Sequence, residues 1–112
     1  LQSAIIATGF SYRPERREFQ GGMLQHILPR IGDIRRFGSA ALVLCWLATG
    51  RLDAFYEEVL NLWDYAAGSL IVSEAGGTVG TTNLAHGINL LVATNTRLDK
   101  EFQILINNAL QH

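Results

Sequence analysis

Short apolar runs alternate with segments of helical periodicity along the whole of this 112-residue chain. Strands are predicted at 4–10, 33–37, 53–57 and 89–93, and helices from residue 14 onward, over 40–49, over 63–75 and after residue 95. This alternation predicts an α/β domain with helices on both faces of a sheet. We therefore predict one layered α-β-α domain over residues 1–112, with a mixed, largely parallel sheet and a main loop from Thr81 to Gly87.

Two of the predicted helices have apolar residues at a spacing that indicates which face packs on the sheet. In the helix over 40–49, which Ser39 would cap, these residues are Ala41, Leu44, Cys45 and Ala48. In the helix over 63–75, which Gly76-Gly77 would end, they are Trp63, Ala66, Ala67, Leu70, Ile71 and Ala75.

Composition restricts the class of protein to which the chain can belong. With 48% hydrophobic and 17% charged residues, the sequence is typical of a globular domain. No apolar run approaches the roughly 20 residues of a membrane-spanning helix, so no membrane partner is expected. The single cysteine, Cys45, lies in an apolar helical run, which is typical of a core thiol in a reducing cytosol and predicts a cytoplasmic protein.

The charged residues are unevenly distributed, although the net charge is only −1. Residues 52–96 contain five carboxylates and no Lys or Arg, so these acids would either point into water or share a bound cation. Residues 13–36 contain six arginines interleaved with acids and without stacking aromatics, which favours a solvated helix face over a nucleic-acid site. The three histidines lack metal-ligand spacing.

One carboxylate, Asp64, falls at the predicted first turn of the helix over 63–75. The start of a helix carries partial positive charge and free N–H groups, so an anion is stabilised there. The residues alone allow two interpretations: Asp64 caps its helix, or it shares a metal ion with a phosphate.

Three motifs resemble the inositol monophosphatase family and occur in the family's order. They are Arg35-x-x-Gly38-Ser39-Ala40-Ala41-Leu42, the run from Ala48 to Glu57, and Trp63-Asp64-x-Ala66-Ala67-Gly68-x-Leu70-Ile71-Val72-x-Glu74-Ala75-Gly76-Gly77. The resemblance extends over about residues 4–110. It implies hydrolysis of a phosphate monoester with bound Mg²⁺, which polarises the phosphoryl group and activates water.

The resemblance also implies which residues bind the ligands. Asp64 would be a metal ligand that lies near the substrate, and a carboxylate oxygen suits Mg²⁺. Gly38, Ser39 and Ala40 would contact the sugar or inositol ring, and Glu57 would contact a ring hydroxyl. The residues alone favour another interpretation, in which Ser39 is an ordinary helix cap and Glu57 an ordinary surface acid.

The family's acidic pair and its aspartate–proline–x–aspartate–glycine–threonine element, which supply most metal ligands, do not occur in this sequence. We therefore expect a C-terminal half of a sugar-phosphatase-like fold that lacks its N-terminal metal-binding half. The catalytic residues would lie in that half, and the chain would be inactive alone and homodimeric when complete. The substrate would be a small phosphorylated polyol or sugar. An alternative is a non-catalytic RNA- or protein-binding module of the same family, and a third hypothesis is an assembly half with exposed apolar surface.

Overall fold

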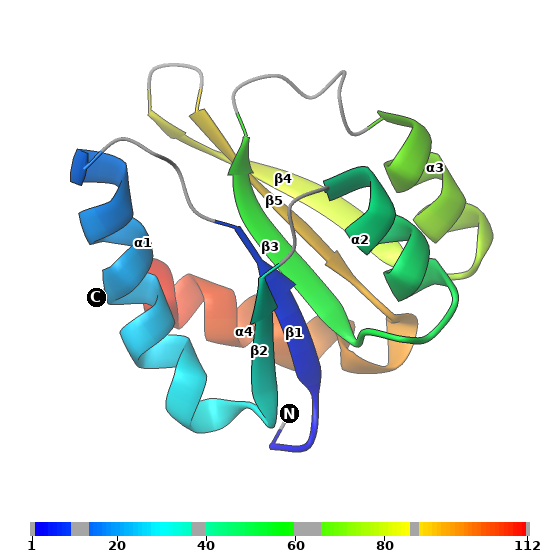
Figure 1. Ribbon diagram of the computed structural model, residues 1–112, viewed down its shortest axis with the longest axis horizontal. Helices are drawn as coiled ribbons and strands as arrows, with labels where there is room; N and C mark the ends of the chain where they lie inside the picture. The colour runs from blue at the N-terminus through cyan, green and yellow to red at the C-terminus, as the bar shows by residue number, and fades with distance from the viewer. Residues whose placement is uncertain (1, 10–13, 37–39, 60–65, 86–87, 112) are drawn as a thin grey trace.

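The computed structural model describes residues 2–9, 14–36, 40–59, 66–85 and 88–111 (Figure 1). In this part of the chain, five strands form one sheet in the order β2-β1-β3-β5-β4. The strands are β1 (Ile5–Thr8), β2 (Asp33–Arg36), β3 (Ala54–Val59), β4 (Thr78–Ala85) and β5 (Ile88–Thr94). The predicted strands are therefore all present, together with β4, which the sequence analysis missed.

The sheet is mixed, as predicted. Strand β1 pairs in parallel with β2 on one side and with β3 on the other, so that Thr8 lies beside Tyr56. Strand β5 runs antiparallel to both β3 and β4. The parallel part of the sheet is thus β2-β1-β3, and the antiparallel part is formed by the hairpin of β4 and β5.

Helices cover both faces of the sheet, which gives the predicted α-β-α layers (Figure 1). One face is covered by α1 (Pro14–Ile27), which continues into the short helix η1 (Leu28–Arg30), and by α4 (Asp99–Leu110), which follows η3 (Thr96–Leu98). The other face is covered by α2 (Ala40–Ala48) and α3 (Ala66–Glu74). Within the described part of the chain, no helix has the length and hydrophobicity to cross a membrane.

Alternate residues of each strand supply the two apolar cores, because successive side chains of a strand point to opposite faces. On β3, Tyr56 packs with α1 and α4, where its ring centroid lies 6.4 Å from that of Phe102. Its neighbour Phe55 packs with α2 and α3 in the second core. Phe55 and Phe102 are the two largest of the fully buried side chains. This alternation continues to the end of β3, where it separates two adjacent glutamates.

The prediction for the buried face of α2 was wrong in part. Leu44 is buried as expected, but Val43 and Leu47 complete the buried face, and Cys45 and Ala48 are only partly buried. All nine residues of α2 are apolar, so hydrophobic periodicity could not determine its orientation.

The prediction for the buried face of α3 was wrong. The structure buries Gly68 and Val72, whereas Ala66, Ala67, Ala75, Leu70 (59%) and Ile71 (44%) are exposed. The reason is a close approach of the backbone: a Cβ atom on Gly68 would lie 2.7 Å from Cδ1 of Leu44. A glycine at the helix contact lets α3 pack on α2 through its smallest residue and leaves the larger side chains outside. Trp63, from the predicted start of this helix, lies outside the described residues.

The prediction of a main loop from Thr81 to Gly87 was also wrong. Strand β4 extends to Ala85 and pairs with β5 through a register shift between Asn83 and Ala85. As an edge strand with Thr81 and Thr82 at exposed positions, β4 lacks the apolar run by which β1 and β5 were recognised. The predicted helix end at Gly76-Gly77 is confirmed, since Gly76 has a φ of +90°, a conformation that favours glycine.

Candidate functional site at the carboxyl edge of the parallel strands

The three parallel strands end at the same edge of the sheet, and each is followed in sequence by a helix. The chain passes from β1 to α1, from β2 to α2 and from β3 to α3, so three helices begin near this edge (Figure 1). Strand β5 begins there too, because Asn89 pairs with Val59. The carboxyl ends of parallel strands and the N-terminal ends of helices are a favourable place for a phosphate-bearing ligand.

Glu57 lies at this edge, on the sheet face that α2 and α3 cover. It is partly buried and pairs with Leu91 of β5 through the strand register. Its carboxylate lies across Gly9, the residue that follows β1: a Cβ atom on Gly9 would lie 2.8 Å from Cδ of Glu57 and still closer to Oε1. A carboxylate in this position can accept hydrogen bonds from a ligand hydroxyl.

Gly9 is a residue of this candidate site that the sequence analysis missed. The signal was present, because Gly9 ends the apolar run of the first strand. A glycine directly after a parallel strand permits a side chain from the neighbouring strand to lie over the backbone. That neighbour could not be identified before the pairing of β1 with β3 was known.

Four of the predicted ligand-binding positions are not tested by the described side chains. Gly38, Ser39 and Asp64 lie outside the described residues, and Ala40 is described only as the first residue of α2. The last described residues before these positions are Arg36 at the end of β2 and Val59 at the end of β3, and both are at the carboxyl edge. Among the side chains that the structure does describe, no three His, Cys, Asp or Glu residues are grouped so as to hold a metal ion.

Glu58, the neighbour of Glu57, points to the opposite face of the sheet. There it forms a bidentate ion pair with Arg16 of α1: Nε donates to Oε2 at 2.9 Å and Nη2 to Oε1 at 2.6 Å. The side chain of Glu58 is 6% exposed and that of Arg16 21% exposed. The hydrogen bond to Glu58 raises the pKa of Arg16 above its usual value. The Cζ atom of Arg16 also lies over the ring of Phe19, 5.0 Å from its centroid, which is a cation–π contact.

This ion pair changes the interpretation of the acidic region 52–96. Glu58 obtains its cation from a residue 42 positions away, so it neither points into water nor needs a bound metal. Asp53 is also used structurally, because its Oδ2 accepts a hydrogen bond from the backbone N–H of Ile5 at 2.8 Å. The uneven charge distribution is therefore weaker evidence for a metal site than the sequence suggested.

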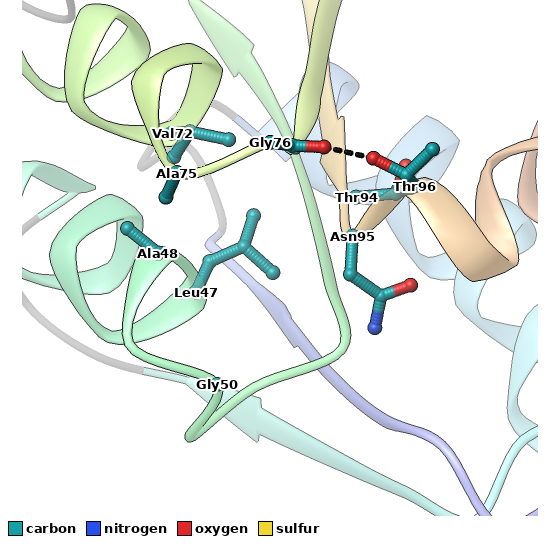
Figure 2. A pocket seen from close by; sticks show the side chains of 10 residues that line it. Leu47, Ala48, Gly50, Val72, Ala75, Gly76, Thr94, Asn95 and Thr96 are labelled. Atoms are coloured by element: carbon teal, nitrogen blue, oxygen red, sulfur yellow. Dashed lines mark hydrogen bonds between the residues drawn. The ribbon is translucent and has the colours of Figure 1, made fainter.

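A cavity of about 240 Å³ lies at the opposite edge of the sheet, where α2 and α3 end (Figure 2). Leu47 and Val72 form part of its apolar lining, and the hydroxyl of Thr96 donates a hydrogen bond to the carbonyl of Gly76 at its rim. The C-terminal ends of helices carry partial negative charge. This cavity is therefore unsuited to a phosphate, in contrast to the edge at which Glu57 lies.

The sequence of this chain is similar to those of known proteins. Residues 1–110 match the inositol monophosphatase family. The inositol-1-monophosphatase SuhB of Mycobacterium tuberculosis (strain H37Rv) is 50% identical over 93 residues, which are 82% of this chain and 32% of that protein. The protein named Nus factor SuhB of Pasteurella multocida is 41% identical over 105 residues, which are 90% of this chain and 39% of that protein.

Solved structures show the same fold. The structure of Mycobacterium tuberculosis SuhB matches with a TM-score of 0.86 and 40% identity, over 97% of this chain and 43% of that one. The IMPase of Thermotoga maritima matches with a TM-score of 0.81 and 29% identity, over 99% of this chain and 43% of that one. This chain thus spans less than half the length of each of these relatives.

Proposed function

This chain belongs to the inositol monophosphatase family, and we propose that it forms the substrate-side part of a magnesium-dependent phosphatase acting on inositol monophosphate or a related sugar phosphate. The observation that carries this proposal is the position of Glu57, whose carboxylate lies over Gly9 where the parallel strands end. In the proposed complex, Glu57 accepts a hydrogen bond from a ring hydroxyl of the substrate. Gly38, Ser39 and Ala40 contact the ring.

The described residues do not form a metal centre by themselves. In our proposal, Mg²⁺ is held by Asp64 together with carboxylates of an N-terminal part that this sequence does not contain. When bound, the metal polarises the phosphoryl group. Besides Asp64, this chain contributes the groups that bind and orient the polyol, and among the described residues Glu57 is the carboxylate at the carboxyl edge on this face.

Exposed apolar surface on α3 supports the proposal that this chain works as part of a longer protein. Leu70 and Ile71 are 59% and 44% exposed, and Ala66 and Ala67 beside them are exposed as well. A continuous apolar surface of this kind usually marks a contact with another part of a protein. We propose that the N-terminal part covers this face in the complete protein. We also propose that the complete protein is a homodimer and is cytoplasmic.

The test is a phosphatase assay with Mg²⁺ and inositol 1-phosphate on two proteins. One is this chain alone, and the other, called here the complete protein, is this chain preceded by the N-terminal part of the phosphatase, either its own or that of the Mycobacterium tuberculosis relative. We expect turnover only by the complete protein, and its loss on Asp64→Asn with the fold retained. Robust turnover by the 112 residues alone would contradict the proposed division of the metal ligands.

A second candidate function is a non-catalytic RNA- or protein-binding module, and the name Nus factor SuhB of the Pasteurella multocida relative favours it. Arg35 and Arg36 of the edge strand β2 are exposed, as such a module would need. Binding through arginines would weaken steeply with salt and would survive Asp64→Asn. The phosphatase activity would show the opposite sensitivity, so one pair of measurements separates the two functions.

A further inference from the structure

Two adjacent residues at the end of β3 have different surroundings. Glu57 lies on the α2–α3 face beside Gly9, and Glu58 lies on the α1–α4 face in its ion pair with Arg16. Because one peptide bond joins the two residues, fixing the side chain of Glu58 also restricts the backbone conformation that determines where the side chain of Glu57 points. The ion pair therefore lies on the opposite face of β3 from the Glu57 carboxylate, which we place in the substrate site.

The same ion pair connects two parts of the carboxyl edge. Arg16 is in the first turn of α1, a few residues after Gly9, and Glu58 is one residue before the last of β3. Thr8 pairs with Tyr56, so Gly9 and Glu57 are the next residues along the two neighbouring strands. The guanidinium of Arg16 thus joins the beginning of α1 to the strand end that carries Glu57.

The form of the interaction suits positioning better than stabilisation. The free energy lost when two buried charges are desolvated is about as large as the free energy gained from their attraction. Such a pair therefore adds little net stability relative to an apolar pair of the same volume. A bidentate guanidinium–carboxylate pair, in contrast, fixes distance and orientation through two parallel hydrogen bonds. Both bonds are present here, at 2.9 and 2.6 Å.

We propose that Arg16 and Glu58 are positioning residues, which hold the end of β3 so that the carboxylate of Glu57 stays over Gly9 and meets a hydroxyl of the phosphorylated polyol. The inference rests on the proposed function. It predicts that the ion pair acts on substrate binding only through Glu57.

A double-mutant cycle on the complete protein tests this prediction. Arg16→Gln and Glu58→Gln are each made alone and together with Glu57→Ala, and KM and kcat for inositol 1-phosphate are measured with saturating Mg²⁺. We expect KM to rise about tenfold in the wild-type background, as for the loss of one hydrogen bond, with kcat changed less than about twofold. In the Glu57→Ala background, the same substitutions should leave KM within about twofold, because residues that act through one another are not additive.

The exposed ion pair between Arg35 and Asp33 provides a matched control. Its Nη1 and Oδ2 atoms are 2.5 Å apart, but the two side chains are 44% and 56% exposed. Asp33→Asn makes the same carboxylate-to-amide change as Glu58→Gln, and KM should not respond. Equal rises of KM in the two backgrounds, or no rise in either, would overturn the positioning role and leave a purely structural ion pair. Arg16→Lys, which keeps the charge without the bidentate geometry, should give a KM between those of the unsubstituted protein and Arg16→Gln. It replaces Arg16→Gln in the cycle if Arg16→Gln does not fold.

Failure of the proposed function would be recognised separately. If the unsubstituted complete protein does not hydrolyse inositol 1-phosphate, the proposed function is wrong, and the positioning role is then judged from crystal structures of the unsubstituted protein and of Arg16→Lys. A Glu57 carboxylate that has moved away from Gly9 in the variant would support the positioning role. An unmoved carboxylate would overturn it.

Discussion

The carboxylate of Glu57 occupies the space that a side chain on Gly9 would need. A Cβ atom there would lie 2.8 Å from Cδ of Glu57, which is closer than real Cβ atoms approach. Since the obstacle is the end of a flexible side chain and not backbone, the carboxylate is expected to move while the strands keep their pairing.

We therefore predict that Gly9→Ala raises KM for inositol 1-phosphate in the complete protein by about tenfold, the effect of losing one hydrogen bond to the substrate. The matched control is Gly22→Ala in α1, where an added Cβ meets open space. That variant should keep KM unchanged and raise the free energy of unfolding by about 0.5–1 kcal/mol, because alanine is the better helix former. An unchanged KM in Gly9→Ala would show that the position of Glu57 does not matter.

Gly68→Ala is predicted to destabilise the domain. The added Cβ would lie 2.7 Å from Cδ1 and 3.0 Å from Cβ of Leu44, so α3 could no longer pack as closely on α2. Overpacking of this kind costs about 1–3 kcal/mol in the free energy of unfolding, which urea denaturation of the complete protein would measure. Gly21→Ala, with open space at its Cβ, is the control. Leu44→Ala should recover part of the loss in Gly68→Ala if contact with Leu44 is its cause.

Glu58→Gln is predicted to lower the free energy of unfolding by about 2 kcal/mol, because it removes the charge-assisted hydrogen bonds of the partly buried Arg16 side chain and leaves it without its anion. Asp33→Asn should have little effect, since both partners of that ion pair are exposed to solvent. Raising the salt concentration should reduce the small contribution of the exposed pair more than that of the Arg16–Glu58 pair. Comparable effects of the two substitutions in urea denaturation would contradict the difference in burial.

Tyr56 is predicted to make the protein sensitive to alkali. Burial raises the pKa of Tyr56, and the nearby Thr8 hydroxyl offsets this only in part. The folded state therefore favours the neutral phenol, and its stability is retained below the unfolded pKa of about 10 and falls as the pH rises above it. Urea denaturation between pH 8 and 11 should show this decline, and Tyr56→Phe should reduce it.

Near neutral pH, Tyr56→Phe should not destabilise the protein. Within the described part of the chain, the buried hydroxyl groups of Tyr56 and Thr8 lack any contact that meets the geometry of a hydrogen bond. Removing an unsatisfied buried hydroxyl leaves stability unchanged or raises it by about 1 kcal/mol. A loss of more than about 1 kcal/mol at pH 7 would reveal a hydrogen bond to this hydroxyl.

The sequence was sufficient to predict the layered α/β fold, because strands such as β3 and helices such as α4 differ clearly in hydrophobic period. In α4, Phe102, Leu105 and Ile106 recur at helical spacing and are all buried. The hydrophobic period did not predict the buried face of α2, which is apolar on all sides, or that of α3, which approaches α2 through Gly68. Contacts between helices decided both orientations, and a single sequence does not contain that information.

The candidate site was predictable only in part for the same reason. Glu57 was identified from its motif, but Gly9 and Arg16 contact the end of β3 from positions more than 40 residues earlier in the chain. Their involvement depends on the parallel pairing of β1 with β3 and on the packing of α1 over the sheet. The roles predicted for Gly38, Ser39, Ala40, Glu57 and Asp64 stay predictions.

The proposed ligand contacts lie near or after the carboxyl ends of β1, β2 and β3, which has a consequence for how substrate preference can diverge among relatives. The two apolar cores lie on the strands and helices, whereas the residues proposed to meet the polyol lie at or after the strand ends. Exchanging those few residues would alter which phosphate ester fits while the interior remains intact. Enzymes with quite different sugar or polyol preferences can thus diverge from a common ancestor without passing through an unstable intermediate.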